Sequence, residues 1–100
     1  MRRLIVTREA AAGIRTAYQW YETQEAGLGR EISRAVEAAV TRAQRNPQSF
    51  RVASDPFRRA LVRRFPFEVF YEYDAEQVVV HMVSHTSQDP AKWRSRLGLS

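Results

Sequence analysis

The stretch RRALVRRFPFEVFYEY, Arg58 to Tyr73, begins with four arginines in seven residues and continues with aromatic, aliphatic and acidic residues. Successive side chains of a strand point to opposite faces of a sheet. If the second part is extended, one face carries Phe67, Val69, Tyr71 and Tyr73, and the other carries Glu68, Phe70 and Glu72. The pattern therefore predicts two strands, Arg58–Arg64 and Phe67–Tyr73, separated at Phe-Pro, with the first of these faces in the core.

Strand patterns continue on both sides of this stretch. Phe50–Ala53 precedes it, and Gln77–His85 follows it after a short polar turn. Val78–Val80 is apolar at consecutive positions, which is typical of a strand covered on both faces. We therefore expect that strand to be central in the sheet.

Before Pro47 the apolar residues recur with the periodicity of helices. A short strand, Arg2–Val6, leads to Thr7, which can act as the N-cap of a first helix. That helix should end near Gly27. A second helix should follow and end at Asn46, because proline at the next position blocks further helix.

At the other end of the chain, Asp89 and Pro90 are an N-cap and first-turn pair for a short terminal helix. Together these elements predict an α+β fold in a single domain over residues 1–100. It consists of an N-terminal strand, an antiparallel two-helix hairpin packed on one sheet face, an antiparallel sheet of three to four strands, and a short C-terminal helix.

Composition limits the classes of protein. One hundred residues with 44% hydrophobic content suit one compact domain. The chain has no cysteine, which excludes disulfides and thiolate metal sites and fits a reducing compartment. The apolar run at the N-terminus is too short for a signal peptide, and no run reaches membrane-spanning length. We therefore expect a cytoplasmic location and no membrane partner.

The basic residues give a net charge of +5, and all sixteen except Lys92 are arginine. This favours contact with nucleic acid or an acidic partner, since a guanidinium binds phosphate or carboxylate in bidentate fashion. A coding bias towards arginine is the alternative.

Arginines are densest between positions 51 and 64, where five of them accompany one acid, Asp55. Strand alternation predicts Arg59 and Arg63 on one face and Arg58 and Arg64 on the other. Either pair, together with Arg51 of the neighbouring strand, could bind a phosphate backbone or a partner. The alternative is a charged strand edge that resists aggregation.

Two histidines end the strand region. His81 and His85 are roughly 13 Å apart on a strand that rises about 3.3 Å per residue, too far to share one ion. We therefore predict no metal site, and no cofactor. His85 stands beside polar residues and is the candidate general acid or base, with a purely structural histidine as the alternative.

The terminal helix carries a second basic group. Trp93 lies between Lys92 and Arg94, so these three side chains could bind a nucleic acid or partner, with the indole stacked on a base. Alternatively Trp93 anchors the helix to the sheet.

Four segments resemble the RelE/ParE superfamily of bacterial toxins, also known as the plasmid stabilisation protein family. They are Tyr18–Ile32, Asn46–Val52, Arg58–Tyr73 and His85–Trp93, in the order expected and over almost the whole chain. The resemblance implies the toxin of a type II toxin–antitoxin system, which inhibits bacterial growth and is neutralised by a cognate antitoxin in a hetero-oligomer. It also implies a fold of two helices packed on an antiparallel sheet.

The superfamily has two branches. RelE-like members cleave mRNA on the ribosome, whereas ParE-like members block DNA gyrase without being nucleases. Many relatives carry an arginine where this chain has Glu68, and often arginines where it has Thr86–Gln88. Because an acid at a phosphoryl-transfer site repels developing negative charge, we favour a ParE-like, non-catalytic inhibitor. A ribosome-dependent mRNA endonuclease using His85 and a non-toxic basic nucleic-acid-binding relative are the alternatives.

Overall fold

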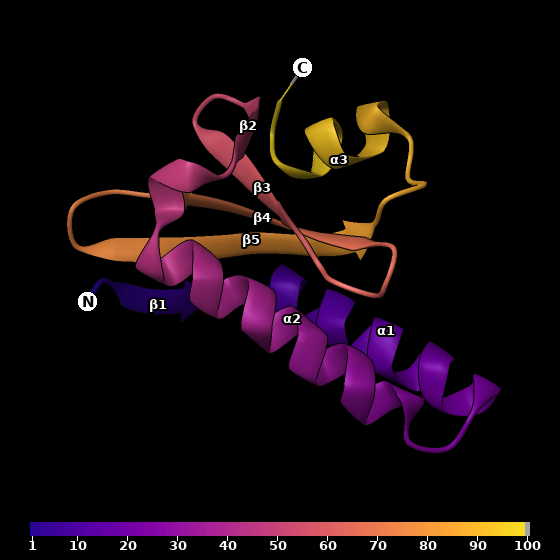
Figure 1. Ribbon diagram of the computed structural model, residues 1–100. Coiled ribbons are helices and arrows are strands. Elements are labelled where there is room, and N and C mark those ends of the chain that lie inside the picture. Colours follow the sequence, from indigo (N-terminus) through magenta and orange to yellow (C-terminus); the bar gives the residue numbers. More distant parts are fainter. Residues whose placement is uncertain (100) are drawn as a thin grey trace.

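The computed structural model describes residues 1–99 and confirms the α+β class (Figure 1). In chain order the elements are β1 (Arg3–Val6), α1 (Arg8–Gln24), α2 (Leu28–Arg45), a 3-10 turn (Pro47–Ser49), β2 (Arg51–Ser54), β3 (Phe57–Leu61), β4 (Phe67–Tyr73), β5 (Gln77–His85) and α3 (Pro90–Arg96).

One sheet contains all five of these strands, in the order β1-β5-β4-β3-β2. β1 is parallel to β5, and the other neighbouring strands are antiparallel. The prediction that Val78–Val80 lies in a central strand is confirmed, because β5 has β1 on one side and β4 on the other, and Val78 and Val80 are fully buried.

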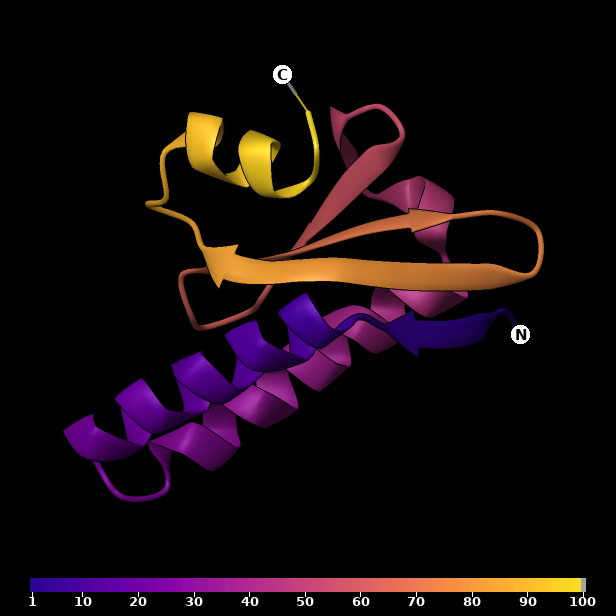
Figure 2. The same cartoon turned by 180° about the vertical axis from the view of Figure 1, so that it is seen from behind.

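The helices lie on both faces of the sheet. α1 and α2 cover one face as an antiparallel hairpin, as predicted, and α3 lies over the other (Figure 2). The main core therefore lies between the sheet and the hairpin, where Ile32 and Val36 of α2 are buried with Val69 and Tyr71 of β4. A second, smaller core lies under α3.

The two faces of β4 follow the predicted alternation. Val69 and Tyr71 are buried in the main core, and the Tyr71 hydroxyl donates to the Pro47 carbonyl oxygen at 2.7 Å. Burial raises the pKa of Tyr71 to about 12. Phe70 points the other way and packs with Met82 and Trp93 in the second core.

Caps fix where the helices start. The Thr7 hydroxyl accepts from the Ala10 N–H at 3.1 Å and also donates to the His81 carbonyl oxygen at 3.2 Å, so the cap joins α1 to β5. The Asp89 carboxylate accepts from the Ala91 N–H at 2.9 Å at the start of α3. Both predicted N-caps are confirmed. No helix in residues 1–99 is long and apolar enough to cross a bilayer.

The prediction for the strand Arg58–Arg64 was wrong at its end. β3 ends at Leu61, and the Val62 N–H donates to the Phe67 carbonyl oxygen at 2.9 Å, which closes a tight loop. Arg63 and Arg64 lie in this loop, and Arg64 has a φ of 73°. Strand alternation therefore does not place these two arginines on sheet faces.

A bulge changes the end of β5. Phe70 is opposite Met82 and Tyr71 is opposite Val80, so His81 has no direct partner on β4. As a result Val80 and Val83 both face the main core, while Met82 between them faces α3. The bulge sets the direction of the last residues of β5, which line the site described next.

Candidate functional site

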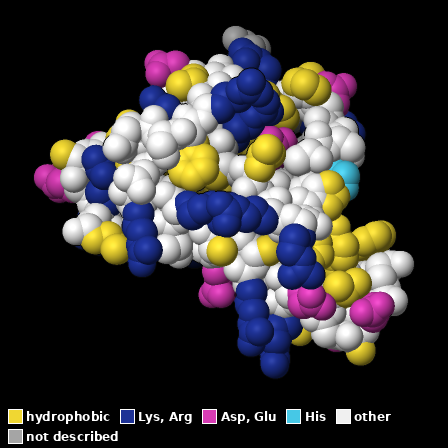
Figure 3. Space-filling view, viewed as in Figure 1, with side chains coloured by type: hydrophobic (Ala, Val, Ile, Leu, Met, Phe, Trp, Pro, Cys, Tyr) yellow, Lys and Arg dark blue, Asp and Glu magenta, His cyan; other side chains and the backbone are white. Residues whose placement is uncertain are grey.

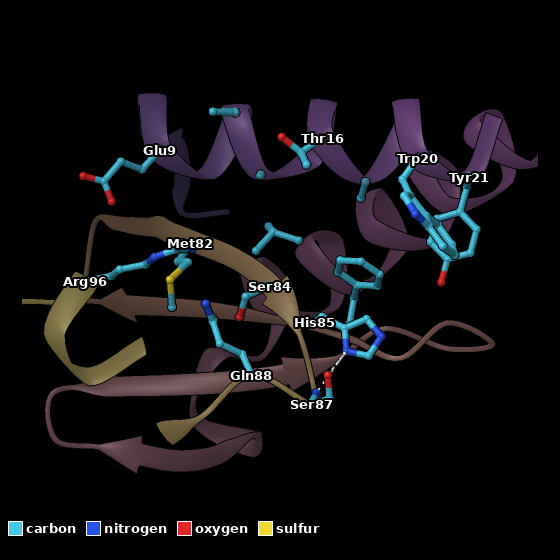
Figure 4. A pocket seen from close by; sticks show the side chains of 15 residues that line it. Glu9, Thr16, Trp20, Tyr21, Met82, Ser84, His85, Ser87, Gln88 and Arg96 are labelled. Atoms are coloured by element: carbon cyan, nitrogen blue, oxygen red, sulfur yellow. Dashed lines mark hydrogen bonds between the residues drawn. The ribbon is translucent and has the colours of Figure 1, made fainter. Parts of the chain in front are cut away.

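A groove of about 780 Å³ lies between α1 and the carboxyl end of β5. β1 pairs only with Gln77–Val80, so no strand lies beside the rest of β5 on this side. Figure 4 shows Thr16 and Trp20 of α1 on one side of the groove and Ser84, His85 and Gln88 on the other. We call this hollow the α1–β5 groove.

Gly13 sets how closely the two walls approach. A Cβ at this position would lie 2.6 Å from the Val83 carbonyl oxygen, so only glycine permits the contact without a shift of backbone. The close approach ties the middle of α1 to β5. Trp20, two helical turns further on, is 57% exposed and meets Tyr21 edge to face at 4.9 Å.

Two polar atoms in this groove, the Ser84 Oγ and the Gln88 Oε1, are buried and have no hydrogen-bond partner among residues 1–99. Ser84 as a residue is only 6% exposed. Buried polar groups left unpaired cost free energy, typically about 1–3 kcal/mol each, and native proteins keep few of them. The groove therefore combines apolar walls with unmet hydrogen-bonding capacity, which is typical of a docking site.

His85 lies at one side of the groove and is exposed, as predicted. Its Nδ1 lies 3.0 Å from the Ser87 N–H, which donates to it, and 2.7 Å from the Ser87 Oγ. Its ring meets Phe67 edge to face at 5.2 Å. Within residues 1–99 the Ser87 N–H orients the ring with Nδ1 as acceptor, and no charged side chain hydrogen-bonds to His85.

The other histidine has a separate partner. His81 Nε2 lies 2.9 Å from the Glu72 Oε1, and its ring meets Phe57 at 5.3 Å. No cluster of three His, Asp or Glu side chains in the described residues could hold a metal ion.

Arg59 and Glu68 form an ion pair on the α3 side of the sheet. Arg59 donates to the Glu68 carboxylate at 3.3 Å, and Glu68 is only 3% exposed. Burial raises the pKa of Glu68, and the charge and hydrogen bond of Arg59 oppose that rise. Arg51 is exposed and stands opposite Arg59 in the β2–β3 ladder. The structure thus brings Arg51 and Arg59 together, and a buried acid pairs with the second.

Arg58 and Arg64 both contact other parts of this chain. Arg58 donates to the carbonyl oxygens of Gln48 at 3.1 Å and Phe50 at 2.6 Å, which ties β3 to the segment before β2. Arg64 makes an ion pair with Glu31 of α2 at 2.9 Å. These two arginines therefore contribute contacts within the chain, far from one another.

Arg63 lies in the loop after β3, close to Arg42 of α2. The pKa of Arg42 is lowered, first by burial and then by the positive charge of Arg63. Arg42 donates to the Leu61 carbonyl oxygen at 3.1 Å, which fixes its position. Sequence reasoning did not single out Arg42. Its helical spacing from Arg34 and Arg45 was the signal that could have found it.

Lys92, Trp93 and Arg94 of α3 have different surroundings. Lys92 is exposed, whereas Trp93 is 7% exposed and its ring lies 5.0 Å from that of Phe70. Arg94 donates to the Ser54 Oγ at 3.2 Å, and its guanidinium lies 5.9 Å from the Trp93 ring. Of the two interpretations for Trp93, the anchor of α3 on the sheet is the one its burial supports.

Comparisons with known proteins give the family. A solved structure described as the chromosomal ParDE TA system from P. aeruginosa is similar with a TM-score of 0.75 and 20% sequence identity, over 87% of this chain and 98% of that chain. At this identity the likeness shows a shared fold. No curated protein sequence matches the chain. The family model for the ParE toxin of type II toxin–antitoxin system, parDE, matches residues 4–90. The chain therefore belongs to the ParE toxin family.

Proposed function

We propose that this protein is the toxin of a type II toxin–antitoxin pair, that a cognate antitoxin restrains it in the cytoplasm, and that it inhibits growth by binding DNA gyrase without catalysis. Membership of the ParE family supports the toxin role. The gyrase target rests on the resemblance to the ParE-like branch of the superfamily, and the absence of catalysis is inferred from the chemistry of the described side chains.

The Arg59–Glu68 pair is the observation that carries the non-catalytic role. A phosphoryl-transfer site needs cations aimed at the transferring phosphate. Here the nearby cation, Arg59, forms an ion pair with the buried Glu68 carboxylate at 3.3 Å. His85, the one candidate acid or base, has Ser87 as its hydrogen-bond partner rather than a charged group. This arrangement favours binding over RNA cleavage.

The α1–β5 groove is where we place the antitoxin. A partner segment with an apolar face would cover Trp20, which is 57% exposed. A hydroxyl or amide on the same segment would satisfy the buried Ser84 Oγ and Gln88 Oε1. Glu9 and Arg96 lie at the far end of the groove and would fix the direction of a charged segment (Figure 4).

Expression of the chain from a tightly controlled promoter tests the toxin role. We expect growth to stop without the antitoxin and to continue when both proteins are made. Purified protein should inhibit gyrase supercoiling and leave ribosome-bound mRNA intact. Normal growth in the absence of the antitoxin would contradict the toxin role. mRNA cleavage that His85→Ala abolishes would replace the gyrase proposal with the endonuclease.

A substitution in the groove tests the antitoxin site. Ala12 is exposed and lines the groove, whereas Ala26, in the turn between α1 and α2, is exposed away from it. We expect Ala12→Arg to stay toxic and to escape neutralisation, because the long side chain blocks the groove. Ala26→Arg should be neutralised normally. Equal neutralisation of both variants would place the antitoxin elsewhere.

A further inference from the structure

Three arginines of α2 lie on one side of the helix. With about 100° per residue, Arg34, Arg42 and Arg45 fall within roughly 80° of one another around the axis. Arg34 and Arg45 are exposed, and Arg42 is half-buried. This side of α2 is turned away from the α1–β5 groove, which has no α2 residue in its lining.

Arg63 adds a fourth guanidinium from the loop after β3. Arg42 donates to the Leu61 carbonyl oxygen at 3.1 Å, two residues before Arg63, so Arg42 lies beside the loop that carries Arg63. The charge of Arg63 accordingly helps to lower the pKa of Arg42. In the described chain none of the four arginines forms an ion pair with a carboxylate. Two like charges held together without an acid repel each other, and an anion between them would remove that repulsion. We call Arg34, Arg42, Arg45 and Arg63 the arginine stripe.

The length and surroundings of the stripe indicate the kind of anion. Residues 34 to 45 span about 16 Å at 1.5 Å per residue, which matches roughly five base-pair steps of 3.4 Å. The exposed residues between Arg34 and Arg45 are Glu37, Ala38 and Thr41. None of them is a large apolar anchor of the kind that protein interfaces use, and Glu37 is the one acid among them. Figure 3 shows Lys and Arg side chains spread over the face that α2 and β3 present, with some Asp and Glu side chains among them.

We propose that the arginine stripe binds the phosphodiester backbone of a nucleic acid, without reading its sequence. Arginine side chains bind phosphate oxygens in bidentate fashion, and a linear row of them follows a regular line of phosphates. Binding of this kind releases counterions and weakens as salt rises. The proposal concerns a surface separate from the groove and does not depend on the gyrase target.

Fluorescence anisotropy of a labelled DNA duplex of about 16 base pairs, titrated with the purified full chain at several salt concentrations, tests the stripe. We expect Arg42→Gln/Arg63→Gln to weaken binding about tenfold or more and to reduce the slope of log K against log salt by about two. Arg34→Gln/Arg45→Gln, at two exposed positions, should act in the same direction, so the result does not depend on the Arg42 contact with Leu61.

The matched control is Arg8→Gln/Arg15→Gln, which removes the same charge at two exposed positions of α1, away from the stripe on α2. We expect it to weaken binding less than about threefold, because only the overall field changes. An equal loss in the control, or no binding by the unchanged protein, would overturn the proposal. Tighter binding of an acidic peptide than of the duplex, lost in the stripe variants, would overturn it in favour of a protein partner. The assay contains neither antitoxin nor gyrase, so these outcomes leave the toxin role untouched.

Discussion

Glu68 is an acid on β4 that the fold buries and pairs with an arginine. Its neighbours across the ladders are Leu61 of β3 and Ser84 of β5. Arg59 is two residues from Leu61 on the same face of β3, so it reaches Glu68 as a diagonal neighbour. That an acid stands here is visible in the sequence. Which arginine it meets depends on the register of two strands.

Glu68→Gln should change how stability depends on pH. Burial raises the pKa of Glu68, so the folded protein holds this proton more tightly than the unfolded chain. From its ordinary value of 4.5 up to the raised pKa, the unchanged protein therefore loses stability as pH rises. The variant lacks this loss. Urea unfolding at roughly pH 4 to 7 should show the free energy of the variant rising relative to the unchanged protein. A constant difference would contradict the buried, proton-binding Glu68.

At the scale of elements, α3 shows how a short helix is held. Its seven residues are too few for a stable isolated helix, so its stability comes from packing. Trp93 supplies that packing against Phe70 and Met82. Pattern reasoning found the helix start at Asp89, because a cap is a local contact. It left the role of Trp93 open, because the burial of an indole depends on a strand far away in sequence.

Trp93→Ala should lower the free energy of unfolding by about 3 kcal/mol or more, since it removes the indole that packs on Phe70 and Met82 and leaves a cavity in the second core. Lys92→Ala, at the neighbouring exposed position, should stay within about 0.5 kcal/mol. Denaturant unfolding followed by circular dichroism measures both. If both variants lost equally little free energy of unfolding, Trp93 would not be the anchor. Its interpretation as a residue that stacks on a partner would then gain support.

At the scale of the whole molecule, β1 joins the N-terminal segment to β5. It pairs with β5 over Arg3–Val6 and Gln77–Val80, across more than seventy residues of sequence. In the sequence α1 and α2 follow β1 and precede the other four strands. The hairpin therefore packs on a sheet that contains strands from both sides of it in the chain. This arrangement supports the proposal of one cooperative domain.

The two tryptophans allow that proposal to be tested. Trp20 lines the α1–β5 groove, and Trp93 lies under α3 on the other face of the sheet. In a Trp20→Phe variant the fluorescence reports only on Trp93. We expect its thermal transition to coincide with that of far-ultraviolet circular dichroism, as two-state unfolding requires. An earlier transition for Trp93 would show that α3 unfolds separately from the rest of the domain.

Sequence alone determined the types and order of the elements, two N-caps and the resemblance to the toxin superfamily. Thr7, Asp89 and the alternation of β4 were all visible, since periodicity and capping involve residues a few positions apart. The end of β3 was misplaced, because the loop closed by Val62 and Phe67 interrupts an arginine-rich run that reads as extended.

Tertiary structure alone decided the parallel pairing of β1 with β5, the bulge at His81, the α1–β5 groove and the pairing of the arginines. The physical reason is the same for each. Strand register, the approach of Gly13 to Val83 and the hydrogen bond from Arg42 to Leu61 join residues far apart in the chain, and no short window of sequence contains both partners.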